Sequence, residues 1–333
     1  MSDGFFDKLG AGRPTYQTNA VRADCAPQAT YPPQPGQPAQ ISSMKRWSAA
    51  SDVFRGAEET YDKLPAALYR TGVDNYGNPL LLKQKHDTDG LLELPDDASA
   101  TILREFDTFW ERNEAFRSRG FLHKRGFLLW GPPGSGKTSC VNILIKRLVT
   151  DRSGIVLFLD NPGVAAHVLR MVRMIEPERP MVCVMEDLDA LVSNYGEHEY
   201  LSLLDGEAQV DRVAFVATTN YPERLDRRFC DRPSRFDTIQ YIGMPMSDAR
   251  MAYLRAKEPS LTEQELTEWT RLTDGFSLAH LKELIVAVKC LGQSFKAALD
   301  RLEVMRVQRP SSEDEPTRRG VGFVGKSNRK LYA

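Results

Sequence analysis

The stretch that decides the fold covers residues 125–139 and reads RGFLLWGPPGSGKTS. Apolar residues 127–130 predict a buried strand, and the turn after them fits the pattern G-x-x-x-x-G-K-[ST]. In such a turn the glycines let backbone N–H groups close around a phosphate, and the positive end of the following helix points at the same group. A glycine-rich turn without a ligand is the alternative, but it would not need the strand before it and the helix after it. The expected ligand-binding residues are Gly131, Pro132, Pro133, Gly134, Ser135, Gly136, Lys137, Thr138 and Ser139.

Strand-like and helical stretches alternate after this turn. Several of the strand-like stretches are continuous apolar runs, which is typical of parallel strands buried on both faces. The fold class expected is therefore α/β, a doubly wound parallel sheet. The strands are expected at residues 127–130, 155–159, 181–185, 213–218 and 238–242.

An acidic pair ends one of these strands. The stretch MVCVMEDLDAL places Glu186 and Asp187 at the carboxyl end of a buried strand, which lies beside the phosphate loop in such folds. One carboxylate can hold Mg²⁺ and the other can polarise an attacking water. Simple capping of the strand is the alternative.

The remaining sequence predicts four further regions. A Pro/Gln-rich arm and a polar tail cannot bury enough apolar surface to fold, so disorder is expected at both ends. The arm is followed by a small module, with a short helix over 44–64 and two strands around a DNYGN turn. After Pro245 the pattern is all helical, with Thr262 and Ser277 as expected N-caps. The expected boundaries are 1–45 for the arm, 46–98 for the module, 99–245 for the α/β domain, 246–308 for the helical lid and 309–333 for the tail.

Composition excludes several classes of protein. The net charge is −1 over 333 residues, so no global charge points to nucleic acid, and the basic tail reads as a solvated segment. The five cysteines lack a C-x-x-C pair, which disfavours a zinc site and indicates a reducing compartment such as the cytoplasm. No apolar run approaches the roughly 20 residues of a membrane span.

The chain resembles the AAA family of ATPases in three features taken together. These are the phosphate loop, the acidic pair and the segment VAFVATTNYPERLDRRFCDRPSRFD. Within the family, RGFLLWGPPGSGKTS, EDLDA and TTNYPERLD look most like the mitochondrial branch that translocates the Rieske iron–sulfur subunit and its bacterial and phage relatives. The resemblance implies an ATPase that uses ATP and Mg²⁺ in a homo-oligomeric ring, with six subunits expected, and remodels or translocates a protein or an assembly.

The resemblance also implies individual roles. Thr138 and Glu186 match the metal-linked positions, Asp187 matches the water-activating acid, and Asn220 matches the residue that orients water. Arg232 and Arg235 match arginine fingers that act on the nucleotide of the neighbouring subunit; a solvated charged loop is the alternative for that segment.

Three departures from the family pattern keep other functions open. Most relatives have Asp–Glu where this chain has Glu186–Asp187, so it is open which acid activates water, and a nucleotide-gated binding module with little turnover is a further candidate. The stretch LDNPGVAAHVLRMV has no aromatic residue where threading members of the family carry one. Ser234 replaces the usual glycine beside the arginines. A nucleic-acid motor or loader is the remaining alternative.

Overall fold

The computed structural model describes residues 46–50, 53–57, 59–85, 91–95, 97–205 and 210–307. The chain divides into two units, residues 1–61 and residues 62–333. The first unit contributes an antiparallel hairpin of β1 (Arg46–Ala50) and β2 (Val53–Ala57), in which Ala50 pairs with Val53. The helix expected over 44–64 is therefore wrong. Trp47, Val53 and Phe54 are aromatic or β-branched and favour extended backbone, and in this hairpin that preference overrides the helical spacing of the apolar residues.

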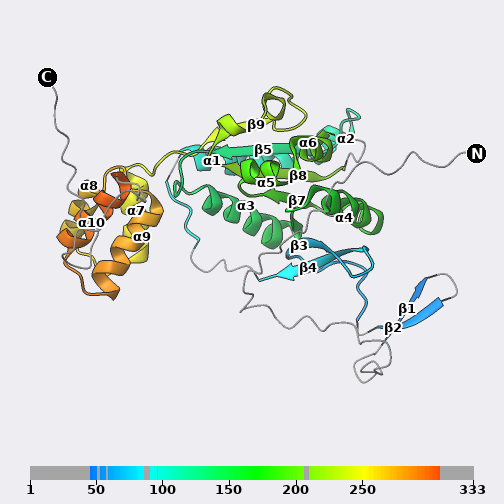
Figure 1. The fold of residues 1–333 in the computed structure, drawn as a ribbon, viewed down its shortest axis with the longest axis horizontal. Coiled ribbons are helices and arrows are strands. Elements are labelled where there is room, and N and C mark those ends of the chain that lie inside the picture. The colour runs from blue at the N-terminus through cyan, green and yellow to red at the C-terminus, as the bar shows by residue number, and fades with distance from the viewer. Residues whose placement is uncertain are drawn as a thin grey trace, which may run out of the picture. The chain divides into compact units, whose positions relative to one another are not determined.

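The second unit is built on one sheet (Figure 1). Its strands run in the order β4-β3-β6-β7-β8-β5-β9, and every neighbouring pair is parallel except the antiparallel pair β3–β4. This confirms the doubly wound α/β class. The strands are β3 (Leu68–Val73), β4 (Pro79–Gln84), β5 (Lys124–Trp130), β6 (Ile155–Phe158), β7 (Met181–Met185), β8 (Val213–Thr219) and β9 (Thr238–Tyr241).

Helices cover both faces of the sheet, so the central strands are buried on both sides. All residues of β7 and β8 are buried, which explains their unbroken apolar runs. One core packs the sheet against α1 and α3, and the other packs it against α4, α5 and α6. The helices of this layer are α1 (Asp97–Glu111), α2 (Asn113–Arg117), α3 (Lys137–Arg152), α4 (Pro162–Ile175), α5 (Leu188–Tyr195) and α6 (Glu197–Asp205), with short 3₁₀ turns η2 (Pro222–Arg224) and η3 (Arg227–Phe229).

The two strands around the DNYGN turn form as expected, and they extend the α/β sheet. β3 lies parallel to β6, with Arg70 opposite Phe158, and β4 forms the outer edge. Thr71 reinforces the junction because its hydroxyl donates to the carbonyl of Phe158 across 3.2 Å. Residues 68–84 of the expected 46–98 module are thus part of the α/β layer, while residues 46–57 form the separate hairpin.

The helical lid has a core of its own. Leu254, Leu266, Trp269, Phe276 and Leu281 are among its buried residues. Both expected caps are present: Thr262 forms a capping box with Glu265, and the Ser277 hydroxyl accepts from the backbone of His280. The elements are α7 (Ser247–Lys257), α8 (Glu263–Leu272), α9 (Leu278–Ile285), the π-helical turn η4 (Val286–Cys290) and α10 (Phe295–Val307).

The expected disordered arm (1–45) and the whole of the expected tail (309–333), together with residue 308, lie outside the described residues. Within the described part of the chain, no helix combines the length and apolar character needed to cross a bilayer. None of the four cysteines in that part forms a disulfide.

Candidate functional site

The carboxyl ends of three neighbouring strands gather the polar residues that the sequence singled out. The glycine-rich loop follows β5, the acidic pair follows β7 and Asn220 follows β8. These strands are adjacent and parallel, so their carboxyl ends share one edge of the sheet. Open α/β sheets bind ligands at this edge.

The glycine-rich loop is shaped by close contacts that no side chain would tolerate. A Cβ atom on Gly134 would lie 2.8 Å from the Ser277 hydroxyl, and the backbone there has a φ of +75°. Helix α3 begins at Lys137 with no side-chain cap on its N-terminal N–H groups. The Lys137 ammonium is buried and donates to the carbonyls of Gly131 and Pro132, at 2.8 and 2.9 Å. Burial lowers the pKa of Lys137, and the negative charge of Asp187 partly offsets this effect.

The donor set of this loop fits a polyphosphate. Ser135 is buried, and its hydroxyl has no hydrogen-bond partner. The uncapped start of α3 and the Lys137 ammonium add further donors, and together they suit an anion that carries several oxygens. The residues that would hold such a phosphate group are therefore those of the predicted loop.

The two acids have different surroundings. Burial raises the pKa of Glu186, the charges of Asp187 and Asp160 raise it further, and a hydrogen bond with Thr138 and the charge of Arg70 lower it. The Thr138 side chain and Glu186 thus meet beside the loop, as the resemblance implies for metal-linked residues. The described residues hold no group of three or more His, Cys, Asp or Glu side chains able to bind a metal alone. A single carboxylate beside a hydroxyl, as in Glu186 and Thr138, suits Mg²⁺, which usually takes one or two carboxylates and completes its shell with water and substrate phosphate.

Two hydrogen bonds hold Asp187, one to Thr218 in β8 and one to Asn220, which follows that strand. Its backbone N–H donates to the Thr218 hydroxyl at 3.1 Å, and its carboxylate accepts from the Asn220 amide at 3.3 Å. The backbone of Asp187 has a φ of 49° and a ψ of 55°, which is the left-handed region that few residues other than glycine adopt. Backbone strain of this kind collects at functional sites.

An apolar cleft adjoins the phosphate loop. Leu92 and Leu94, Leu103 of α1, Ile143 of α3 and Leu278 of the lid line it beside the loop backbone. The lid closes one side directly, since the backbone N–H of Leu278 donates to the carbonyl of Gly134 at 3.2 Å. An apolar slot beside a phosphate cradle suits the base of a nucleotide.

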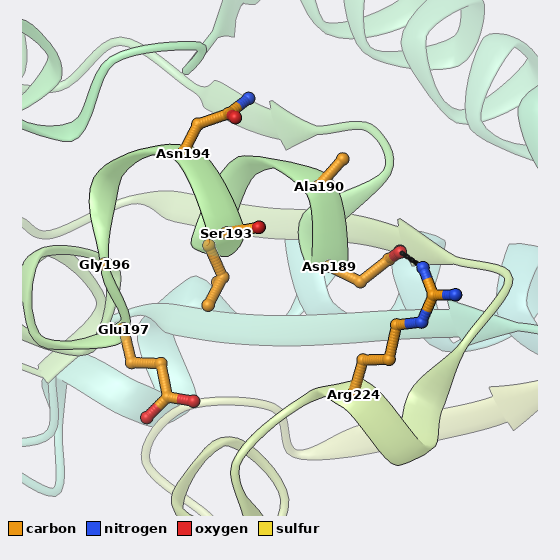
Figure 2. Close-up of a pocket in the computed structure, with 8 residues that line it drawn as sticks. Asp189, Ala190, Ser193, Asn194, Gly196, Glu197 and Arg224 are labelled. Carbon is orange, nitrogen blue, oxygen red and sulfur yellow. Dashed lines mark ion pairs between the residues drawn. The ribbon is translucent and has the colours of Figure 1, made fainter.

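A second, polar cavity of about 530 Å³ lies between α5, the start of α6 and η2 (Figure 2). The Asp189 side chain there is 8% exposed, accepts from the Thr219 hydroxyl at 2.7 Å and pairs with Arg224 at 3.8 Å. Arg224 also stacks on the Tyr221 ring, with the guanidinium carbon 3.9 Å from the ring centre. The Asp189–Thr219 and Asp187–Asn220 bonds are neighbouring cross-links between the end of β8 and the start of α5.

The two arginines of the RPSRFD segment lie at the other end of β5. Asp237 exchanges hydrogen bonds with the backbone of Gly126, and a Cβ on Gly126 would lie 1.8 Å from the carbonyl oxygen of Arg235. Gly126 and Gly131 are five residues apart, or roughly 16 Å at the rise of a strand. Neither arginine is therefore placed to reach the phosphate loop of its own chain.

The same two arginines differ in exposure. The Arg232 side chain is 63% exposed, and the Arg235 side chain is only 8% exposed. Asp205, the last residue of α6, pairs with Arg232 at 3.7 Å and with Arg235 at 3.4 Å, and Arg235 also donates to the carbonyl of Arg228. Arg232 is the one of the pair that is presented to solvent.

Residues 127–244 match the family model AAA, the ATPase family associated with various cellular activities. The chain thus contains a domain of this family.

The chain is 28% identical over 232 residues to the probable 26S proteasome regulatory subunit 10B of Caenorhabditis elegans, and this alignment covers 62% of this chain and 57% of that protein. It is 27% identical over 208 residues to the mitochondrial chaperone BCS1 of Homo sapiens, covering 56% and 49%. It is 29% identical over 208 residues to the ATP-dependent zinc metalloprotease FtsH of Marinobacter nauticus, covering 55% and 32%. The chain thus spans between about a third and somewhat over half of these relatives.

The structure brings the predicted loop, acids and Asn220 to one edge, and it places both arginines away from that edge. The apolar cleft was missed by the sequence interpretation. Its only local signal is the apolar stretch LLELP at residues 91–95, because the other lining residues come from distant segments.

Proposed function

We propose that this chain binds ATP with Mg²⁺ at the carboxyl edge of the sheet and hydrolyses it. Lys137 and the loop N–H groups would hold the phosphates, and Thr138 and Glu186 would hold the metal. Mg²⁺ would neutralise charge on the phosphate oxygens. Asp187 would accept a proton from the attacking water, and Asn220, bonded to that carboxylate at 3.3 Å, would fix its orientation.

We infer that the catalytic arginine comes from a neighbouring copy of the chain. The observation that carries this proposal is the roughly 16 Å of β5 between the Arg235 backbone contact at Gly126 and the phosphate loop. An exposed cation that cannot serve its own site fits a finger for the next subunit, where a planar guanidinium suits the γ-phosphate oxygens. Arg232 is the proposed finger, and Arg235 would fix the loop that carries it. A closed homo-oligomeric ring, six-membered by resemblance, follows from such a head-to-tail contact.

The proposed use of the energy is the remodelling or movement of a protein or an assembly. The names of two relatives, a proteasome regulatory subunit and a mitochondrial chaperone, support a protein target. The connection from β6 to α4 is only residues 159–161, and the Asn161 side chain caps α4 directly. This short link without an aromatic residue favours a folded cargo over the threading of an extended chain, and the mitochondrial Rieske translocase branch is the proposed relative. Cysteines that form no disulfide among the described residues support a reducing compartment such as the cytoplasm.

A second candidate is a nucleotide-gated binding module with little turnover. The observation that favours it is Asp187, whose side chain is one methylene shorter than glutamate and whose backbone is held in the left-handed region. Such a module would bind ATP tightly, change state and hydrolyse it slowly.

The test combines size and turnover on the full chain. Light scattering with Mg-ATP, Mg-ADP and no nucleotide gives the assembly state, and phosphate release across a range of protein concentrations gives the rate per subunit. A ring with trans arginines predicts a rate per subunit that rises with concentration until assembly is complete. A rate independent of concentration in a monomer contradicts the ring, and tight ATP binding without release supports the second candidate. Adding double-stranded DNA, with no expected change, addresses the nucleic-acid alternative.

A further inference from the structure

The strand that residues 68–73 add to the sheet carries a cation to the edge where the acids lie. β3 runs parallel to β6, so its carboxyl half reaches the same edge as the ends of β6 and β7. The Arg70 guanidinium pairs with the carboxylate of Asp160 at 2.9 Å, just beyond the end of β6. Asp160 in turn lies beside Glu186, which follows β7. Arg70, Asp160 and Glu186 thus form a row across three neighbouring strands.

Hydrogen bonds hold the backbone of this row in place, and the Asp160 carboxylate is oriented by its ion pair with Arg70. The carbonyl of Asp160 accepts from the hydroxyl of the buried Tyr200 at 2.9 Å, and the next residue, Asn161, caps α4. Thr71 and the β3–β6 ladder hold the strand that carries Arg70. The Asp160 side chain is 48% exposed, and Arg70 is the ion-pair partner that the structure gives it.

The charges in the row act on the site. Phe158 of β6 pairs with Val184 of β7, so Asp160 and Glu186 each lie two residues beyond the same register position. Asp160, and Arg70 through its ion pair with Asp160, are therefore near enough to influence the metal-linked acid electrostatically. Without Arg70, three carboxylates, those of Asp160, Glu186 and Asp187, would face the phosphates with Lys137 as the nearby cation described above.

We propose that Arg70 is a positioning residue for the nucleotide site: it holds the Asp160 carboxylate and neutralises its charge beside Glu186 and Asp187. The inference rests on the proposed function, because it concerns the binding and hydrolysis of ATP. Its consequence is that the two strands of residues 68–84 are an electrostatic part of the ATPase site, in addition to covering the edge of its sheet.

The test is a double-mutant cycle that removes each charge singly and both together. It compares four full-length proteins: wild type, Arg70→Ala, Asp160→Asn and the double variant. ATP binding is measured by calorimetry in EDTA, where no hydrolysis occurs and repulsion of the bare phosphates is greatest. Arg70→Ala is expected to raise the Kd of ATP about three- to tenfold, the range of couplings carried by residues around a site. The double variant is expected to return close to wild type, since it has no unpaired carboxylate. A purely structural role for Arg70 would not be rescued by Asp160→Asn.

Matched variants separate charge from shape. Arg70→Lys keeps the cation and should bind ATP almost as wild type does, while Lys83→Ala removes an exposed cation from neighbouring β4 and should change nothing. The proposal is overturned if Arg70→Ala binds ATP as wild type does, or if the double variant is as weak as Arg70→Ala alone. Failure of the proposed function is distinguishable, because then wild type itself would bind no ATP.

Discussion

The Asn220 amide donates to the Asp187 carboxylate across 3.3 Å, and this bond joins the end of β8 to the acidic pair that follows β7. Two oxygen-bearing side chains from neighbouring strand ends are thereby fixed beside the phosphate loop. The bond leaves one carboxylate oxygen of Asp187 outside the Asn220 contact, where it could face a water molecule. Glu186 is engaged differently, with Thr138.

These contacts predict different outcomes for the two acids. Asp187→Asn should keep Mg-ATP binding but lower kcat by about 10²–10⁴, the usual contribution of a general base. Glu186→Gln should instead raise the Mg²⁺ concentration needed for half-maximal activity. Phosphate release measured against Mg²⁺ concentration separates the two effects. Glu199→Gln, an exposed acid on α6, is the matched control. If Glu186→Gln alone gives an ATP-bound protein without turnover, the two roles are reversed.

Lys137 gives the prediction for binding. Its ammonium now donates to two loop carbonyls, and the same donors would turn to the β- and γ-phosphates. Lys137→Ala should weaken ATP binding about tenfold to a hundredfold, from the about 1.5–3 kcal/mol of a hydrogen bond to a charged group. Calorimetry with ATP measures it, and exposed Lys146→Ala on the same helix should bind normally. Equal affinity in both variants would remove the phosphate-loop assignment.

The phosphate loop and the five parallel strands from β5 to β9 could be predicted because their information is local. A glycine pattern and continuous apolar runs each lie within a few residues of one another, and the expected strand bounds differ from the observed ones by only a few residues. The expected fold class is confirmed. The roles of the individual site residues stay predictions.

The parts that the sequence did not reveal depend on pairing between distant segments. Nothing near Leu68 indicates that it will lie opposite Val156, so the sequence could predict two strands but not their place in the sheet. The Arg70–Asp160 pair follows from that same register. The exposure difference between Arg232 and Arg235 also arises from packing, here against Asp205 and the backbone of Gly126.

His123 gives a prediction for the pH dependence of stability. The ring is buried, stacks on Phe109 at 4.1 Å between ring centres and touches Trp110 and Phe116, and its Nδ1 has no hydrogen-bond partner. Burial lowers the pKa of His123; the carbonyl of Phe109 and the charge of Asp211 oppose this, and Arg212 adds to it. The unfolded chain, with a histidine pKa of about 6.5, therefore takes up a proton at a higher pH than the folded protein does.

The sign follows from that difference. As the pH falls below about 6.5, the unfolded state binds more protons, so the free energy of unfolding should decrease by up to about 1.4 kcal/mol per pH unit from this group. Denaturant unfolding at pH 7.5 and pH 5.5 measures the change. His123→Phe should lose this part of the pH dependence, whatever its absolute stability. The same pH dependence in both proteins would show that His123 titrates normally.

The arginines of the RPSRFD segment give the prediction that decides whether the protein acts as a ring. Arg232→Ala should leave stability unchanged, because the side chain is 63% exposed, but should lower kcat by about 10³–10⁵ if it serves as a finger. Arg235→Ala should instead destabilise the fold by about 3 kcal/mol, since it removes one partner of a largely buried ion pair.

Subunits with Arg232→Ala keep an intact phosphate loop, and subunits with Lys137→Ala keep an intact finger, so each alone should be inactive. In a mixed assembly, a Lys137→Ala subunit can supply Arg232 to the intact loop of its neighbour. Mixing the two inactive proteins should therefore restore part of the ATPase rate, and the restored rate should depend on the mixing ratio and on protein concentration. Labelled subunits establish that exchange has occurred. Exchange without any recovery of activity would mean that Arg232 does not act across a subunit boundary, and the ring proposal would lose the observation on which it stands.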